Sequence, residues 1–335
     1  MGRVPPRAWD LGARLLRLTT NSSILESGLT NTTERIHSTA IISEQAEMAT
    51  DVIVGPQVII EGHVRIGSGC VLHRRALLCG PLTLGKRNQV FTGAVLGEQP
   101  QHMAYKNEPT SLEIGDDNIF RENATVHRAT VHSWTTRIGN RNLFMAGSHV
   151  GHDSQIGDGC ILAEGALIAG HCVLENNAYM GANSAVHQFV RIGQLAHMGP
   201  VSGMIQDVPP FMRASEFNKV TGVNIAGMQQ AGYAQNEIVA VQRAFCILYQ
   251  ERNLLAVAMA KINYEFPDVP AIKVLLQFVR QSKRGIVFGR KHFARDPDNA
   301  IQELSLPKGE ENHLNRTPPR TAGGQISARE NRTAA

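Results

Sequence analysis

The sequence has few aromatic residues, no long apolar run and little excess of charge of either sign. Phenylalanine, tryptophan and tyrosine make up 5% of the 335 residues, which suits a narrow interior better than a broad aromatic core. No stretch approaches the roughly 18 consecutive apolar residues of a membrane-spanning helix, so we expect no stable membrane insertion. A formal net charge of +4 gives no reason to expect a nucleic-acid partner. The five cysteines form no Cys-x-x-Cys pair, which favours packing residues in a reducing compartment over a zinc or redox motif.

What the sequence does have is an apolar residue at every sixth position through most of its first two hundred residues. The first uninterrupted series is Ile36, Ile42, Met48, Val54, Ile60, Ile66, Leu72, Leu78, Leu84, Val90 and Leu96. It resumes at Ile114 and again at Ile138, and then runs on to Met204. A period of six fits neither a helix nor a single strand, and it is typical of a parallel β-helix built from hexads of one short strand and one corner. Three hexads would close a triangular coil of about eighteen residues, and the coils would stack about 4.8 Å apart.

The pattern divides the chain into four segments. Residues 35–210 are expected to form the β-helix, and 211–290 a small α-helical domain. Residues 1–34 and 291–335 are expected to be disordered, because they lack the repeat and are rich in polar residues. An organelle-targeting signal is a second interpretation of the first segment, which contains Arg, Ser and Thr and few acidic residues.

Helical spacing replaces the repeat after Pro209-Pro210, where we expect the coils to end. One helix is predicted from a cap at Asn236, a second near Leu254–Tyr264, and a third over Val269–Ser282 that opens at Pro270.

Two segments interrupt the repeat, Glu98–Leu112 and Val131–Arg137, and the second contains His132 and Trp134. Loops that a repetitive core does not need are usually functional. Histidines are dense around and beyond the second interruption: His127, His149, His152, His171 and His187.

The eighteen-residue coil aligns several of these polar residues. His152, Gly170 and Gln188 are eighteen residues apart and should stack in one column, with Asp153 and His171 in the next. A base beside an exposed backbone N–H and an amide is what acyl transfer needs, because the base takes a hydroxyl proton and the donor stabilises a tetrahedral oxyanion. Asp153 is placed to orient the imidazole, although neighbouring strand residues normally point to opposite faces.

Two other interpretations of the histidines stay open at this point. One is ordinary surface histidines, and the other is a zinc site shared between subunits, since neutral imidazole is a good zinc ligand. We expect no bound metal, and the sequence has no serine or cysteine nucleophile pattern.

Five longer motifs are more specific than the hexads. They are Ala-Gly-Ser-His-Val-Gly-His-Asp at 146–153, Ala-Gly-His at 169–171, Ala-Val-His-Gln-Phe at 185–189, Gln-Asp-Val-Pro-Pro at 206–210 and Gly-Val-Asn-Ile-Ala-Gly at 222–227. Through them the sequence, from about residue 36 to 285, resembles the acyl carrier protein–UDP-N-acetylglucosamine O-acyltransferases of lipid A biosynthesis.

The resemblance implies a homotrimer of left-handed parallel β-helices with an active site in each cleft between subunits. His152 would be the general base that deprotonates the sugar 3-hydroxyl, Asp153 would support it, and the Gly170 N–H would stabilise the oxyanion. Pro200 falls where the family has a small residue that borders the acyl chain. Residues expected to line the substrate cleft are His127, His149, His171, His187, Gln188, Gln101 and Asn224.

The resemblance also implies the substrates and partners. The donor would be a 3-hydroxyacyl thioester on acyl carrier protein, and the acceptor the sugar nucleotide UDP-N-acetylglucosamine, in the first step of lipid A biosynthesis. No separate cofactor is expected, because the carrier brings its own phosphopantetheine. The expected location is the bacterial cytoplasm, or an organelle if the first segment is a transit peptide.

The sequence departs from the family pattern in two places. The usual Gln-Asp-x-Lys-Tyr reads Gln-His-Met-Ala-Tyr here, with His102 and Ala104 at the substituted positions, and Ala226 and Gln230 stand where acidic and basic residues are usual. These changes motivate a second hypothesis, the same chemistry on another, amino-sugar nucleotide. An N-acyltransferase of the same pathway, a non-catalytic trimeric scaffold and a metal-dependent hydratase are the further alternatives.

Overall fold

The computed structural model describes residues 35–289, which belong to one compact unit of the chain. The two segments predicted to be disordered, 1–34 and 291–335, lie outside the described residues.

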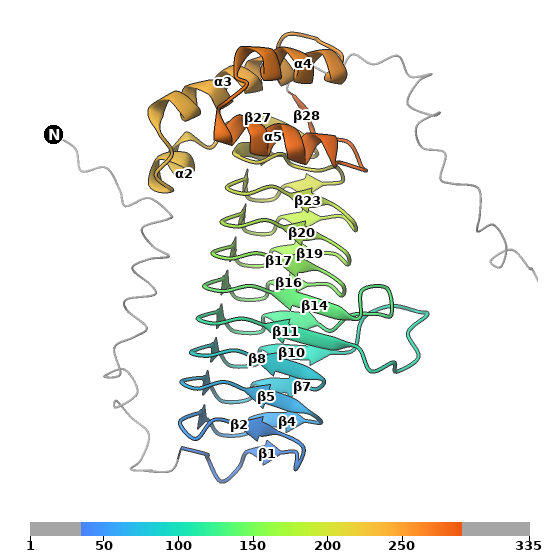
Figure 1. The fold of residues 1–335 in the computed structure, drawn as a ribbon. Coiled ribbons are helices and arrows are strands. Elements are labelled where there is room, and N and C mark those ends of the chain that lie inside the picture. Colours follow the sequence, from blue (N-terminus) through green and yellow to red (C-terminus); the bar gives the residue numbers. More distant parts are fainter. Residues whose placement is uncertain (1–34, 290–335) are drawn as a thin grey trace, which may run out of the picture. The chain divides into compact units, whose positions relative to one another are not determined.

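The described residues form a left-handed parallel β-helix of hexapeptide repeats whose short strands stack into three sheets (Figure 1). The first sheet contains β1 (Ile41–Ile42), β4 (Ile59–Glu61), β7 (Leu77–Cys79), β10 (Val95–Glu98), β13 (Thr125–His127), β16 (His149–Val150), β19 (Leu167–Ile168), β22 (Ala185–Val186) and β25 (Gly203–Met204). The second sheet contains β2 (Glu47–Met48), β5 (Val64–Ile66), β8 (Leu82–Leu84), β11 (Ser111–Ile114), β14 (Thr135–Ile138), β17 (Gln155–Ile156), β20 (Val173–Leu174) and β23 (Arg191–Ile192). The third contains β3 (Ile53–Val54), β6 (Val71–Leu72), β9 (Gln89–Val90), β12 (Ile119–Phe120), β15 (Leu143–Phe144), β18 (Ile161–Leu162), β21 (Tyr179–Met180), β24 (His197–Met198), β26 (Met212–Ser215), β27 (Lys219–Val223) and β28 (Phe288–Gly289).

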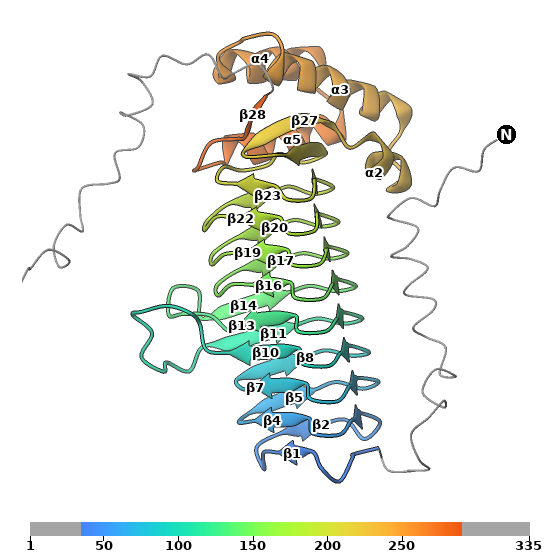
Figure 2. The ribbon, with the colours of Figure 1, turned by 180° about the vertical axis from the view of Figure 1, so that it is seen from behind.

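The register between coils confirms the eighteen-residue repeat. Ile41 lies beside Ile59, eighteen residues later in the chain. Two coils are longer, because Val95 pairs with Thr125 and Thr125 with His149. Both extra segments lie between the first and second sheets, so they project from the same edge of the coils (Figure 2).

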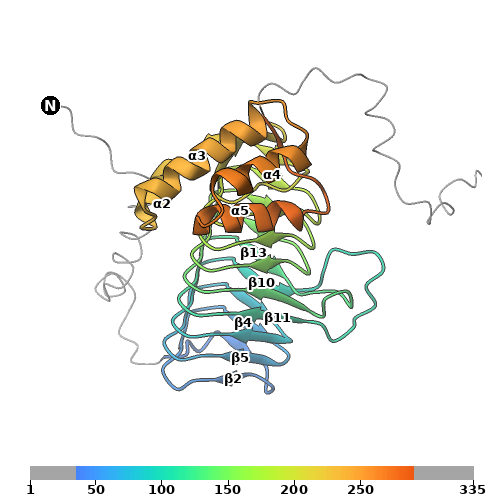
Figure 3. The same cartoon turned by 45° about the horizontal axis from the view of Figure 1, so that its top comes forward.

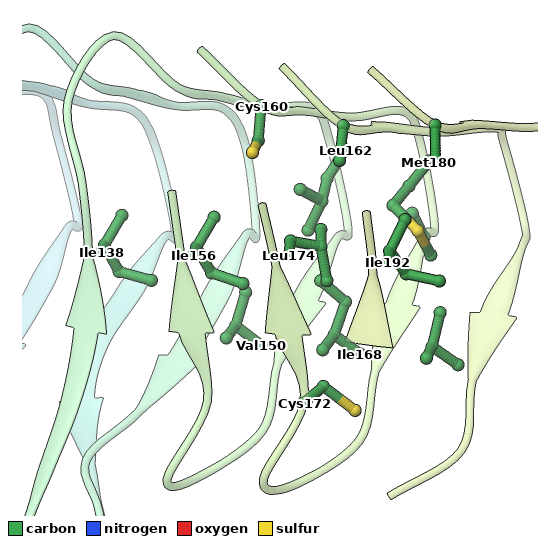
Figure 4. Packing of buried hydrophobic residues seen from close by; sticks show 14 of the residues in the cluster. Ile138, Val150, Ile156, Cys160, Leu162, Ile168, Cys172, Leu174, Met180 and Ile192 are labelled. Carbon is green, nitrogen blue, oxygen red and sulfur yellow. The ribbon is translucent and has the colours of Figure 1, made fainter. Parts of the chain in front are cut away.

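The apolar anchors of the hexads fill the interior, as the period predicts. Anchors such as Leu162, Ile168, Leu174 and Met180 are almost completely buried (Figure 4). Anchors of one sheet stack from coil to coil, as Leu162 does with Met180 and Ile156 with Leu174. This continuous core fixes the register of the corners, and it therefore positions the polar residues that the corners carry.

Four helices lie over the C-terminal end of the coils (Figure 3). They are α2 (Ile225–Gln230), α3 (Gln235–Tyr249), α4 (Leu255–Glu265) and α5 (Pro270–Arg280). The predicted cap at Asn236 is wrong, because α3 begins at Gln235 and its N-cap is Ala234, whose N–H donates to Glu237. Pro270 does open the last helix, at a position where its missing N–H costs nothing. None of the helices within residues 35–289 is long and apolar enough to span a bilayer.

The coils continue beyond Pro209-Pro210, contrary to the sequence-based prediction. β26 extends the third sheet by pairing in parallel with β24, His197 beside Arg213. The chain then turns back, and β27 pairs antiparallel with β26. The segment after residue 210 is therefore not purely helical, since it closes the sheet before the helices begin.

Candidate active site

The polar residues of interest gather at one corner of the β-helix, where the first sheet passes to the second. We call this the histidine corner. It is formed by the turns at 151–154, 169–172 and 187–190 and by the inserted loops at 99–110 and 128–134 (Figures 1 and 2). Because these turns belong to successive coils, the predicted column of His152, Gly170 and Gln188 follows from the strand register.

His152 and Asp153 form a hydrogen-bonded pair at the centre of the histidine corner. The Nδ1 atom of His152 lies 2.6 Å from Oδ2 of Asp153, and both residues are buried. Two neighbours on a straight strand would face opposite ways, but Asp153 has a φ of 61° in the left-handed region. That conformation, which Asp tolerates better than most residues, turns the carboxylate to the side of the ring. With the carboxylate accepting at Nδ1, Nε2 of a neutral His152 is the proton acceptor.

The loop at 128–134 supplies most of the other donors to Asp153. The Thr130 hydroxyl donates to Oδ2 at 2.8 Å, and the Ser133 hydroxyl donates to Oδ1 at 2.5 Å. The Ser133 N–H also donates to Oδ1, at 3.0 Å. Burial would raise the pKa of Asp153, but the hydrogen bonds from His152, Ser133 and Thr130 outweigh burial and hold it well below its ordinary value. Asp153 is therefore a carboxylate at neutral pH.

Gly170 lies against the ring of His152, one coil further on. A Cβ at this position would be 2.7 Å from Cε1 and 2.8 Å from Nε2 of His152. Only glycine lets the backbone approach the imidazole so closely. In residues 35–289, no hydrogen bond takes the Gly170 N–H as its donor.

Further imidazoles surround the His152–Asp153 pair. His171 packs edge-on against His152, with ring centroids 5.0 Å apart, and its Nε2 is 3.8 Å from Asp153. His102 from the first inserted loop and His132 from the second pack edge-on against His152 and His171, respectively. Burial lowers the pKa of His171 despite the nearby carboxylate. The His171 imidazole is therefore largely uncharged at neutral pH.

His127 and His149 form a second pair on the neighbouring coils of the first sheet. Their ring centroids are 4.8 Å apart, and Nδ1 of His149 lies 2.8 Å from the hydroxyl oxygen of Thr125. Burial, together with the neighbouring His149, lowers the pKa of His127 to about 4, and burial also lowers the pKa of His149. Nδ1 of His127 is buried without a hydrogen-bonding partner among the described residues.

The structure separates the remaining predicted site residues from this centre. His187 and Gln188 lie at the histidine corner but are exposed, as is Gln101 in the first inserted loop. Pro200 is exposed at a different corner, where the third sheet passes to the first. Asn224 is buried with its amide in use, because it caps α2 at Gly227 and donates to the Leu195 carbonyl. Its contact with substrate stays a prediction, and its described contacts are structural.

The sequence reasoning did not assign a role to Thr130 or Ser133. It noted the second interruption and His132, but Thr130 and Ser133 contact Asp153 at separations of 23 and 20 residues. Neither separation is a multiple of the hexad. The signal that was available was the position of the interruption itself, one coil before His152.

His152, Asp153 and His171 have potential metal-binding atoms within 4.8 Å of one another. The Asp153 oxygens already accept hydrogen bonds from three side chains, His152, Thr130 and Ser133. A metal would have to displace these donors, so the donor set suits an acid–base pair better than a metal site.

Comparison with known proteins identifies a family. A family model described as UDP-N-acetylglucosamine O-acyltransferase, domain 2, matches residues 207–287, and a bacterial transferase hexapeptide model of six repeats matches 135–170. The acyl-(acyl-carrier-protein)–UDP-N-acetylglucosamine O-acyltransferase of Syntrophobacter fumaroxidans is 39% identical over 256 residues, which cover 76% of this chain and 99% of the relative. The enzyme of the same name from Thermodesulfovibrio yellowstonii is 41% identical over 254 residues, with 75% and 98% covered. The solved structure of LpxA from Acinetobacter baumannii has a TM-score of 0.72 at 36% identity, and 76% of this chain and all of that chain are covered.

Proposed function

Because this chain belongs to the acyl-(acyl-carrier-protein)–UDP-N-acetylglucosamine O-acyltransferase family, we propose that the histidine corner carries out the acyl transfer with His152 as its base. The chain is an acyltransferase whose donor is an acyl carrier protein thioester and whose acceptor is UDP-N-acetylglucosamine. The observation that supports the site most directly is the buried His152–Asp153 pair with Gly170 against its ring.

His152 acts on the acceptor hydroxyl, which we assign to position 3 of the sugar. Asp153 holds the Nδ1 proton, so Nε2 accepts the hydroxyl proton as the oxygen attacks the thioester carbonyl. The resulting oxyanion accepts a hydrogen bond from the Gly170 N–H. When the intermediate collapses, the carbon–sulfur bond breaks and the proton on His152 passes to the phosphopantetheine sulfur. The products are the O-acyl sugar nucleotide and the free thiol of the carrier.

The neutral imidazoles around the pair suit contact with polar substrate groups. His127, His149 and His171 have lowered pKa values, so they offer one donor and one acceptor each without a charge. We assign them to the substrate cleft together with His187, Gln188 and Gln101, and we assign a 3-hydroxyacyl chain to the donor. No cofactor is needed beyond the phosphopantetheine that the carrier brings.

We propose that the working enzyme is a homotrimer with each cleft shared between two chains. The supporting observation is that Pro200, assigned to the acyl-chain pocket, and His152 lie at different corners of one chain. We place the reaction in the bacterial cytoplasm, a reducing compartment in which the five unpaired cysteines remain thiols.

The test is transfer from a 3-hydroxyacyl carrier protein to UDP-N-acetylglucosamine, compared between the wild type and His152→Ala. Loss of the base should lower kcat by about 10²–10⁴-fold with the fold retained. Ile156→Ala is the matched control, because Ile156 is a buried hexad anchor on the next strand. It should lower the free energy of unfolding by about 2–5 kcal/mol and leave kcat near wild type. If the His152→Ala variant kept the wild-type kcat, His152 would not be the base.

A further inference from the structure

The second inserted loop surrounds the Asp153 carboxylate with donors from a neighbouring coil. Thr130 donates its hydroxyl to Oδ2 and its N–H to both oxygens at 3.2 Å. Ser133 donates its hydroxyl and its N–H to Oδ1. We infer that Thr130 and Ser133 are positioning residues of the reaction, which act by fixing the Asp153 carboxylate against His152.

Hydrogen bonds within the second inserted loop fix its conformation, and with it the direction of these donors toward Asp153. The Trp134 N–H donates to the Thr130 carbonyl at 2.9 Å, and the His132 N–H donates to the Thr130 hydroxyl oxygen at 3.2 Å. The Asp153 N–H in turn donates to the Thr136 hydroxyl oxygen at 2.8 Å, where β14 begins its run into the second sheet. The coil core does not need this insertion, because the coils that carry no insertion close in eighteen residues. The loop and the carboxylate therefore form one hydrogen-bonded unit.

These hydrogen bonds decide which imidazole donates to the Asp153 carboxylate. Ser133 occupies Oδ1 and Thr130 shares Oδ2 with the Nδ1–H of His152. His171 Nε2, 3.8 Å from Oδ2, is a second imidazole that could take this position. Without the loop hydroxyls, the carboxylate could rotate, pair with His171 and release Nδ1 of His152. Held as it is, Asp153 keeps the His152 proton on Nδ1 and leaves Nε2 free to accept.

This inference rests on the proposed role of His152, and its test separates the two. Thr130→Val and Ser133→Ala remove one hydroxyl each, whereas Thr130→Ser and Ser133→Thr keep it. Each removal should lower kcat about 10-fold, the usual weight of a hydrogen bond to a charged group, with the KM for the acceptor nearly unchanged. The hydroxyl-keeping variants should stay within about threefold of wild type. Ser184→Ala is the control for loss of a buried hydroxyl, because the Ser184 hydroxyl has no hydrogen-bonding partner among the described residues, and its kcat should not change.

A double-mutant comparison identifies the route of action. In an Asp153→Asn background, Thr130→Val and Ser133→Ala should cause no further loss of kcat, because the carboxylate they position is gone. An undiminished 10-fold loss in that background would overturn the inference, as would wild-type kcat in both single variants. If His152→Ala itself kept wild-type kcat, the proposed base would fail. If His152→Ala lost activity while Thr130→Val and Ser133→Ala did not, only the positioning role would fail.

Discussion

A single methyl group added at Gly170 would collide with the imidazole of His152. The ideal Cβ would lie 2.7 Å from Cε1 of His152, and the backbone behind it is held by strand pairing on both sides. The ring must therefore move. We predict that Gly170→Ala lowers kcat by about 10²-fold, the scale of a displacement near 1 Å at a reacting group. Steady-state kinetics and a thermal melt of the same variant are the measurements.

Gly222→Ala is the control for this change. Gly222 lies in β27, and a Cβ there would meet nothing within 4 Å. Its kcat should match that of the wild type. Equal kcat in Gly170→Ala and the wild type would mean that the imidazole has more room than the structure gives it.

Several histidines resist protonation because they are buried, and this makes the fold sensitive to acid. Burial lowers the pKa values of His127 and His197 to about 4, with a further contribution from His149 and Arg213, respectively. Between about pH 6.5 and pH 4 the unfolded chain binds these protons and the folded chain does not. The free energy of unfolding should therefore fall by up to about 1.4 kcal/mol per pH unit for each such histidine as the pH drops through this window. Urea unfolding at pH 7, 6 and 5 measures the slope.

His197→Phe isolates one of these contributions away from the histidine corner. The His197 ring stacks on Tyr179 with centroids 4.5 Å apart, and phenylalanine can keep that stacking without a titrating group. The pH slope of this variant should be smaller than that of the wild type. An identical slope would show that His197 titrates alike in the folded and unfolded chains.

The residue-level prediction succeeded where the repeat carried the information. An eighteen-residue period is enough to place Gly170 over His152, because strand pairing transmits the register from coil to coil. It cannot place Thr130 and Ser133, since the inserted loop breaks the period and its shape depends on its own hydrogen bonds. For Asn224, which the motif assigns to the substrate, the period does not predict the role that the structure shows, the capping of α2.

Among the elements, a ladder of buried asparagines links the coils just before β9, β12 and β15. The Asn118 amide donates to Oδ1 of Asn88 and to the Gly139 carbonyl, and its Oδ1 accepts from the Asn142 N–H. Oδ1 of Asn142 then accepts from the Cys160 N–H. The later coils have Ala178 and Ala196 in the same column, so the ladder supports the coils that carry the long insertions.

We predict that Asn118→Ala destabilises these coils. It removes the three hydrogen bonds of the Asn118 side chain and leaves buried groups of its neighbours unpaired. The free energy of unfolding should fall by about 2–4 kcal/mol, and chemical denaturation measures it. Gln155→Ala, on the exposed face of β17, should change it by less than about 0.5 kcal/mol. If the free energy of unfolding fell no more in Asn118→Ala than in Gln155→Ala, the asparagine ladder would not stabilise the coils.

The strands could be predicted from the sequence where their apolar residues belong to the single core of the β-helix. The hexad anchors from Val54 to Met204 all face the same interior, so a single period specifies the strands of the three sheets up to β25. β26 and β27 lie beyond the last hexad and are specified by a hairpin pairing that the period does not contain. The start of α3 was predicted at Asn236 because asparagine is a preferred N-cap residue. In the structure Asn236 lies in the first turn of α3, and Ala234 is the N-cap.

At the scale of the whole molecule, a single chain leaves large apolar side chains uncovered. Val131, Trp134, Leu167 and Phe189 are each about half exposed, and Val201 is 77% exposed. Val131, Trp134 and Phe189 belong to the histidine corner. Exposed apolar side chains that share one part of a surface favour contact with another chain. Val201 directly follows Pro200 at the corner between the third and first sheets. That corner is therefore a candidate to face the histidine corner of a second copy.

Subunit complementation tests whether each site draws on two chains. His152→Ala removes the proposed base, and Pro200→Trp fills the assigned acyl-chain pocket, so either variant alone should be inactive. If one chain supplies His152 and its neighbour supplies Pro200, trimers that contain both variants should recover about a third of the wild-type rate, because one of their three sites then combines two intact residues. Two different affinity tags purify the mixed trimers away from the uniform ones. Mixed trimers no more active than either variant alone would mean that a shared site of this kind does not exist.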